Sequence, residues 1–414
     1  MRKHFLVLLA CCSSLMTQAQ NFRYPFQAQK VIFSGEGYID IVDDSLATAY
    51  FEPHWSVTGE RFPAGFVSGT SMKAAAEFTY TCDHAPDSLV VRGFGADTID
   101  FPAAVVPVRK PATGAYEFSY PATAATRDFA LGKVNYYAPF LIRWQVSLDK
   151  GKTWLTMDTT AHKIYVTKDA PMAENIHFRH FHTVLELSCR NAKGMSTDSA
   201  IIKACWSEFE DRVLLNHKGD SLHYYQTLMG KGSDLVELLR TRDAQCYTFA
   251  QLFLALIKIQ GIYRGGNYVN ITPLSTKYGC GHVNVFLVKN WNFGTKSAAA
   301  DCPDFPYLNT YDEDKLIAGT DYTWVSADVN DANGSPGQCS ANPASFFGNH
   351  QIAKLDGVYY DPSYGVTYSS LADLKDRAFS GWGILSYDPV TTYIVCNITD
   401  DTSKESLQEV ISTY

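Results

Sequence analysis

The chain has 414 residues, of which 46% are hydrophobic and 14% aromatic, enough to fill the cores of two or three domains. Its formal net charge is −8, so a nucleic-acid partner has no electrostatic support. After the first twenty residues, no run is long and apolar enough to be expected to span a bilayer.

Residues 1–19 have the pattern of a secretory signal peptide. A basic start at Arg2 and Lys3 precedes an apolar stretch, and Ala19 is a small residue of the kind that signal peptidase reads. We therefore expect cleavage after Ala19 and a secreted or periplasmic protein. The stretch from Leu8 to Cys11 also resembles a bacterial lipobox, and in that alternative the protein is lipid-anchored at Cys11.

Export permits disulfides, but the sequence does not fix their pairing. The chain has ten cysteines, and removal of Cys11 and Cys12 with the signal peptide leaves eight. If Cys246 is a free thiol, seven remain, so at least one other cysteine is also unpaired.

Residues 20–172 read as an all-β domain. Short runs of alternating or β-branched residues are separated by clusters of Gly, Pro, Asp and Ser. Examples are Tyr38–Val42, Ser88–Arg92 and Phe140–Val146. The pattern favours one immunoglobulin-like β-sandwich, or two smaller ones, that ends at a linker over 168–171. No catalytic constellation stands out in it, so we expect a targeting or spacer role and an enzyme domain, 173–414, that works without it.

Two stretches raise the question of a metal site. His180 and His182 would share one face of a strand, but no further ligand accompanies them. Asp328 to Gly334 resembles a calcium loop, yet Ala332 stands where the third oxygen ligand is needed and no closing Glu follows. We predict no metal and no organic cofactor.

A buried helix over 243–261 is the centre of the second domain. Its apolar residues recur at helical spacing, Asp243 is suited to cap it and Gly261 to end it. Two shorter helices, over 198–209 and 234–239, are expected to pack around it. Cys246 falls in the first turn, where free N–H groups and the helix dipole favour a thiolate. The alternative is a small buried core residue, because nucleophilic catalysis also needs a base and an orienting group.

A predicted hairpin supplies both the base and the orienting group that Cys246 would need. Strands are expected over 268–272, over 283–288 and on each side of Asp356-Gly357, a strong two-residue turn signal. That turn sets Leu355 opposite Val358 and Ile352 opposite Asp361. Because side chains alternate, His350 and Asp361 become diagonal neighbours on one face, as a base and its orienting carboxylate must be.

The order Cys246, His350, Asp361 resembles the transglutaminase-like superfamily. The stretch Gln245–Ile262 is similar to the motif around the family's nucleophile, and Asn349–Gly365 is similar to its His–Asp hairpin. The resemblance covers roughly residues 180–400. It implies a papain-like α+β domain, here behind an immunoglobulin-like sandwich, of the kind found in exported bacterial proteins. It also implies that Cys246 is the nucleophile, His350 the general base and acid, and Asp361 the orienting residue.

The chain departs from the family at two places. Tyr247 stands where animal transglutaminases commonly have Trp, and the segment 263–349 is much longer than compact members need. A competing base is His282, which opens an alternating strand but has no acid on a tight hairpin behind it; Asp301 is nineteen residues further on. We therefore prefer His350.

These observations predict an exported cysteine enzyme that cleaves peptide or protein amide bonds, or transfers their acyl groups. Water and an amine both stay open as acceptors. One alternative is a catalytically idle binding or adhesion module that keeps the fold. Another is an amidase that acts on cell-wall peptides.

Overall fold

The computed structural model describes the chain in stretches. They are 26–45, 48–50, 52, 54–59, 61–112, 114–171, 180–225, 234–263, 266–273, 277–278, 281–282, 285–288, 292–293, 325–328, 332–333, 336–341, 343, 346–386, 394–399 and 407–413. Side chains are described up to 272 and again, with gaps, over 336–378. The expected signal peptide, the lipobox and most of the 328–334 loop lie outside the described residues.

The protein has a mixed α+β fold that divides into two compact units. The first unit comprises residues 1–38, 51–131 and 137–164, and the second comprises 39–50, 132–136 and 165–414. Two short segments from the amino-terminal half of the chain, 39–50 and 132–136, thus belong to the second unit. Among the described residues, the helices lack the length and apolar character needed to cross a membrane.

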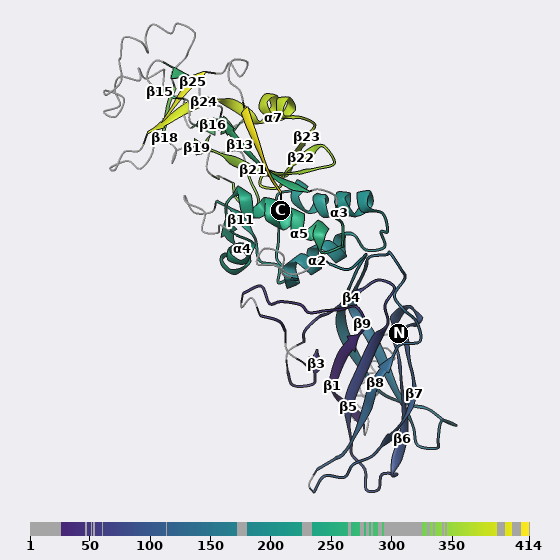
Figure 1. The fold of residues 1–414 in the computed structure, drawn as a ribbon. Coiled ribbons are helices and arrows are strands. Elements are labelled where there is room, and N and C mark those ends of the chain that lie inside the picture. Colours follow the sequence, from purple (N-terminus) through teal and green to yellow (C-terminus); the bar gives the residue numbers. More distant parts are fainter. Residues whose placement is uncertain are drawn as a thin grey trace, which may run out of the picture. The chain divides into compact units, whose positions relative to one another are not determined.

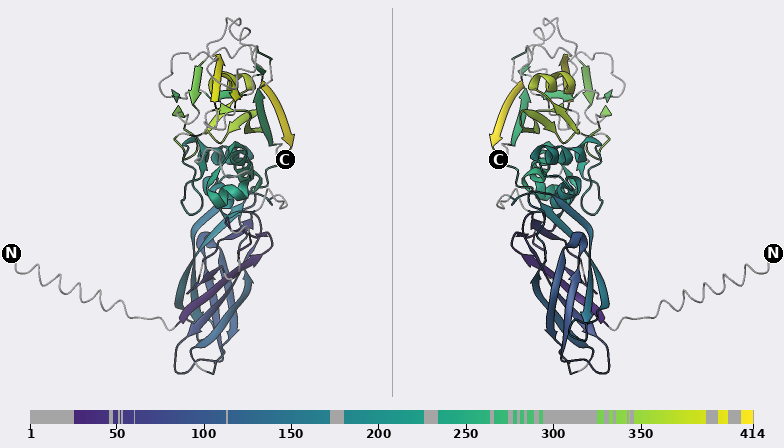
Figure 2. Two further views of the ribbon diagram at one scale, coloured as in Figure 1. Left: turned by 90° about the vertical axis from the view of Figure 1, so that its left-hand side faces the viewer. Right: turned by 90° about the vertical axis from the view of Figure 1, so that its right-hand side faces the viewer.

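The first unit is built from two β-sheets, and its purple-to-blue strands run alongside one another in every view (Figure 1, Figure 2). One sheet has the order β3-β1-β5-β8 and the other β2-β4-β10-β9-β6-β7. The strands are β1 (Phe26–Gly35), β2 (Tyr38–Ile39), β3 (Trp55–Ser56), β4 (Ala64–Val67), β5 (Met72–Tyr80), β6 (Ser88–Phe94), β7 (Asp100–Pro107), β8 (Tyr116–Ala124), β9 (Asn135–Ser147) and β10 (Leu155–Thr167), with the short helix η1 (Ala96–Thr98).

Alternating burial fixes which faces of these sheets form the core. Every second residue of β5 is buried, as expected for a strand with one face inside. Phe78 of β5 meets Trp144 of β9 edge to face at 5.4 Å, so the two sheets face each other across an aromatic core. The predicted strands at 88–92 and 140–146 are confirmed, whereas the strand predicted over 38–42 stops at Ile39.

The second unit combines helices with a further sheet (Figure 1). Its helices are α2 (His182–Asn191), α3 (Asp198–Glu210), α4 (Leu235–Thr241), α5 (Cys246–Lys258) and α7 (Leu371–Ala378). A five-stranded sheet has the order β23-β22-β21-β13-β26. Its strands are β13 (Asn267–Pro273), β21 (His350–Leu355), β22 (Val358–Asp361), β23 (Val366–Tyr368) and β26 (Leu407–Thr413).

The remaining strands of this unit are short or described by backbone alone. They are β11 (His223–Tyr224), β12 (Asp243–Ala244), β14 (Lys277–Tyr278), β15 (Gly281–His282), β16 (Val285–Val288), β17 (Asn292–Phe293), β18 (Val325–Asp328), β19 (Ala332–Asn333), β20 (Phe346–Phe347), β24 (Phe379–Ser386) and β25 (Ile394–Thr399). A second five-stranded sheet has the order β18-β25-β24-β16-β20.

Helix α5 is the core of the second unit, as its sequence predicts. All of its residues except Tyr247 are buried, so the helix is enclosed nearly all round. The predicted N-cap is wrong: Gln245 occupies that position, and Asp243 lies in β12, paired in parallel with β11. The helix ends before Gly261, whose φ of +71° and close approach to Asp169 explain why glycine stands there.

Helix α2 replaces the strand that was predicted to carry His180 and His182. His182 is the first residue of α2, so the two histidines do not share a strand face. The helix has no cap from its own N-cap residue, Phe181; instead Asp44 accepts from the backbone N–H of Thr183 at 3.1 Å. The other oxygen of Asp44 accepts from His217 Nδ1 at 2.7 Å. A carboxylate 139 residues away in sequence therefore caps α2.

The hairpin β21–β22 forms with the predicted register. Leu355 is the Cα partner of Val358, followed by Lys354 with Tyr359 and Ala353 with Tyr360. Asp356 and Gly357 both have positive φ, 51° and 83°, which is the pattern of the turn that suits right-twisted hairpins.

Candidate active site

Three elements of the second unit bring the predicted site residues to one place. Cys246 is the first residue of α5, His350 the first of β21 and Asp361 the last of β22. All three are buried, with exposed fractions of 5%, 4% and 3%. Strand β21 packs on α5 (Figure 1). The start of the strand lies beside the start of the helix, because the backbone N–H of Gln351 reaches Cys246 Sγ.

His350 and Asp361 form the contact that the hairpin register requires. His350 Nε2 lies 2.8 Å from Asp361 Oδ2. The second oxygen, Oδ1, accepts from the backbone N–H groups of Ser363 at 3.2 Å and Tyr364 at 3.4 Å. The carboxylate is therefore held from two sides and fixes the orientation of the imidazole.

The sulfur of Cys246 lies at the edge of β21. The backbone N–H of Gln351 donates to Sγ at 3.4 Å. This N–H makes no hydrogen bond to the neighbouring strand, because the chain leaves β22 at Pro362. The Pro362 carbonyl accepts instead from Gln338 Nε2 at 2.8 Å. An N–H donor and the start of α5 both stabilise negative charge on the sulfur.

The charges of the neighbours decide the protonation state of His350. Burial alone would lower the pKa of this imidazole, but Asp361 and Cys246 raise it to about 10 through charge and hydrogen bonding. His350 is therefore an imidazolium at neutral pH. Its Nδ1 is buried and no group meets it at the distance and angle of a hydrogen bond, although Cys246 is close enough to raise the pKa of the imidazole. Such contacts commonly tighten only when substrate is bound.

Aromatic rings enclose the His–Asp pair. The Phe347 ring lies 5.0 Å from the imidazole of His350, and the Tyr364 ring lies 5.8 Å from it. Burial, then the charge of Asp361, raises the pKa of Tyr364 well above its usual value. A dry surrounding of this kind strengthens the ion pair between His350 and Asp361.

Three residues of the site have no signal in the sequence. Tyr224 is the last residue of β11 and Tyr225 follows it directly. Strand β11 reaches the site through its parallel pairing with β12. For both rings burial raises the pKa most, and the charge of Cys246 raises it further. Tyr225 also has a strained φ of +49°. Gln351 contributes its backbone N–H, and residue type does not indicate which backbone N–H will contact the sulfur. A two-residue parallel pairing leaves no periodic pattern, so reasoning from sequence could not find them.

The structure describes the competing base, His282, and the other cysteines only in part. The structure describes only the backbone of His282, in β15, and its side chain lies outside the described residues, so that alternative stays a prediction. The five cysteines with described side chains, Cys82, Cys189, Cys205, Cys246 and Cys339, are all free thiols. The described residues contain no group of three or more potential ligands that could hold a metal ion.

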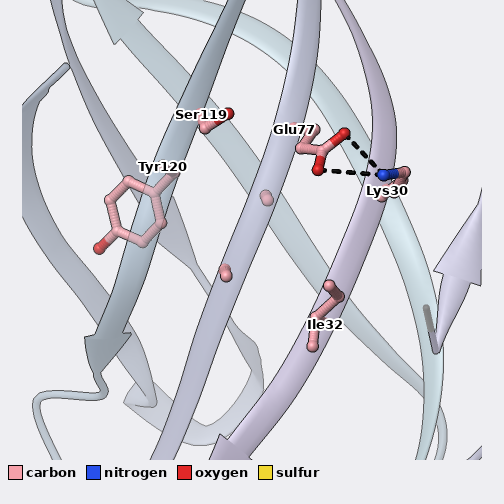
Figure 3. Close-up of a pocket in the computed structure, with 7 residues that line it drawn as sticks. Lys30, Ile32, Glu77, Ser119 and Tyr120 are labelled. Atoms are coloured by element: carbon pink, nitrogen blue, oxygen red, sulfur yellow. Dashed lines mark hydrogen bonds and ion pairs between the residues drawn. The ribbon is translucent and has the colours of Figure 1, made fainter. Parts of the chain in front are cut away.

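A shallow hollow of about 100 Å³ lies on the first unit, over β1, β5 and β8 (Figure 3). Lys30 and Glu77 form an ion pair there at 3.0 Å, and both side chains are nearly half exposed. The ring of Tyr120 lines the other end, and its hydroxyl donates to the carbonyl of Pro102. The residues described around this hollow include no cysteine or histidine.

No protein-family model matches the chain, and no curated protein is significantly similar to it.

Proposed function

We propose that the protein is an exported cysteine enzyme of the transglutaminase-like type that cleaves or transfers the acyl group of peptide or protein amides. Cys246 is the nucleophile, His350 the general acid and base, and Asp361 the orienting residue. The observation that carries the proposal is the 2.8 Å contact between His350 and Asp361 beside a cysteine that opens a buried helix. In this proposal the second unit has a papain-like fold and the first an immunoglobulin-like one.

The first half of the reaction forms an acyl-enzyme. The Cys246 thiolate attacks the amide carbonyl carbon, and a C–S bond forms as the carbonyl oxygen takes up negative charge. His350 then gives its proton to the amide nitrogen, the C–N bond breaks and an amine leaves. Asp361 holds the imidazole in place throughout and compensates its charge.

The second half restores the thiolate. Water or an amine attacks the thioester carbon while neutral His350 takes the proton from the attacking atom. The C–S bond then breaks, and the acid or the new amide leaves. These steps use the side chains of the three site residues and need no metal or cofactor.

The alternative is a binding or adhesion module that keeps the fold without chemistry. The low exposure of Cys246, 5%, is the observation that favours it. The two functions differ in whether a substrate reaches the sulfur and becomes attached to it. Cell-wall peptides are a substrate class that export would make accessible.

Labelling with a peptide that carries a thiol-reactive electrophile tests the proposal. We expect site mapping to find the label on Cys246 in the wild-type protein. His350→Ala should abolish turnover of a peptide amide, and Asp361→Asn should slow it roughly 10²- to 10⁴-fold while the thiol stays reactive. Asp356→Asn, in the turn of the same hairpin, is the matched control. Label on other cysteines alone, or full turnover in His350→Ala, would contradict the assignment.

A further inference from the structure

Two carboxamide side chains beside the nucleophile have unused acceptors. Asn270 of β13 and Gln351 of β21 are Cα partners across the sheet. Their oxygens, Asn270 Oδ1 and Gln351 Oε1, are both buried, and neither has a hydrogen-bond partner. Buried acceptors are nearly always paired, so two unpaired ones in adjacent positions call for an explanation.

The strand pairing brings these carboxamides close together. Since the N–H of Gln351 donates to Cys246 Sγ, it is directed away from β13. Residues that do not exchange backbone hydrogen bonds across an antiparallel pair have the closer side chains. Asn270 and Gln351 form such a pair, so their carboxamides lie side by side on one face of the sheet.

The same alternation places the two carboxamides on the side of the sulfur opposite to the general base. Successive side chains of β21 point to opposite faces, so His350 and Gln351 lie on either side of the strand edge at which Sγ is bound. Tyr268, two residues before Asn270, shares the carboxamide face. Its ring lies 5.0 Å from that of Tyr247, the residue after Cys246, so this face also borders the start of α5.

In the proposed reaction, the two parts of a substrate lie on opposite sides of Cys246 Sγ. The leaving nitrogen must be near His350, which protonates it, so the acyl part of the substrate extends toward the opposite side. Asn270 and Gln351 are partly exposed as whole residues, so rotation of either carboxamide can bring its buried oxygen to a ligand there. Their unused oxygens accept N–H groups, which a peptide main chain carries and a simple acyl chain does not.

Building on the proposed function, we propose that Asn270 and Gln351 form a subsite that accepts main-chain N–H groups of the acyl donor. The acyl donor is then a peptide recognised through its backbone, on the acyl side of the bond that breaks. A substrate that donates a hydrogen bond to each oxygen binds more tightly, because both buried acceptors are then paired.

N-methylated peptides test this subsite in the full-length protein. Three activated peptide esters of one sequence are compared: unmethylated, N-methylated at the residue with the scissile carbonyl, and N-methylated at the residue before it. We expect at least one methyl group to lower kcat/KM of the wild type roughly three- to tenfold, the effect of one neutral hydrogen bond. In Asn270→Leu or Gln351→Leu the unmethylated ester should lose a similar factor and the penalty of methylation should disappear.

Matched variants separate a lost acceptor from a disturbed fold. Asn270→Asp and Gln351→Glu keep the acceptor oxygens and nearly the same shape, so they should keep the preference for the unmethylated ester. The proposal is overturned if the wild type turns over all three esters equally well, or if the preference survives in both Leu variants.

A small thiol reagent distinguishes failure of the subsite from failure of the enzyme proposal. Methyl methanethiosulfonate forms a disulfide with Cys246 and has no N–H group, so Asn270→Leu should react with it as fast as the wild type. A wild-type protein whose Cys246 does not react and is not acylated by any ester contradicts both proposals. A reactive, acylated Cys246 without a preference for free N–H contradicts the subsite alone.

Discussion

At the scale of single residues, the charge of His350 is the property on which the site depends. Its imidazole is buried between a carboxylate and a thiol, and their combined effect raises its pKa to about 10 despite the burial. A protonated imidazole in this place keeps Asp361 paired and the sulfur compensated. In the proposed reaction, the same imidazolium would supply the proton that a leaving amine needs.

Because of this raised pKa, the second unit should lose stability as the pH becomes alkaline. The unfolded chain releases the His350 proton near 6.5, while the folded protein keeps it to about 10. The stabilisation is therefore fully present below pH 6.5 and is lost as the pH rises through 10. We expect the free energy of unfolding to fall between pH 7 and 10 with a steeper slope in the wild type than in His350→Gln.

Urea unfolding at several pH values, followed by tryptophan fluorescence, measures this slope. His84→Gln is the control, because His84 is exposed and lies in the first unit. Equal slopes in the wild type and His350→Gln would show that the imidazole carries no extra proton in the folded state.

At the scale of elements, the cap on α2 is a contact that no local pattern announces. Asp44 accepts from Thr183 N at 3.1 Å and also binds His217. Asp44 and Thr183 are buried, and His217 is partly buried. Asp44→Ala removes the cap and leaves buried donors unpaired, so it should lower the free energy of unfolding by about 2–3 kcal/mol. Asp40→Ala, at an exposed position of the same segment, should change it by less than about 0.5 kcal/mol. Chemical denaturation compares them, and equal effects would contradict the capping role.

The elements also show how far sequence reasoning reaches. The hairpin with His350 and Asp361 was predictable because a two-residue turn fixes its register over eleven residues. Helix α5 was predictable from its apolar spacing. The cap by Asp44, the approach of Tyr225 and the N–H of Gln351 were not, because each joins segments that meet only through the tertiary fold.

At the scale of the whole molecule, the second unit depends on residues that precede its main body. Tyr165 and Tyr136 both donate to Glu186 of α2 at 2.7 Å, and the backbone N–H of Lys168 donates to Gln260 at 2.9 Å. A chain starting near residue 173 would lack these contacts, so the expectation that it works alone stays a prediction. The physical reason is that the start of β9, with Tyr136, and the end of β10, with Tyr165, complete the buried polar network around α2.

A truncated chain that starts at Ala173 should therefore fold poorly. It lacks the cap from Asp44 and the phenols that satisfy Glu186, so buried polar groups of α2 are left unpaired. We expect a thermal midpoint at least 10 °C lower than that of the second unit in the full-length protein, or no cooperative transition. Calorimetry of both chains measures this, and an unchanged midpoint would show that these contacts contribute little.

The rate at which Cys246 alkylates as a function of pH tests the central claim most directly. Iodoacetamide is added between pH 5 and 10, and each cysteine is quantified by peptide mapping, with the half-exposed Cys82 as the internal comparison. If His350 and the start of α5 hold Cys246 as a thiolate, its rate should already be near maximal at pH 7, well below the range in which an ordinary thiol gains reactivity. A rate that rises only around pH 8.5, as for a free thiol, would contradict the account.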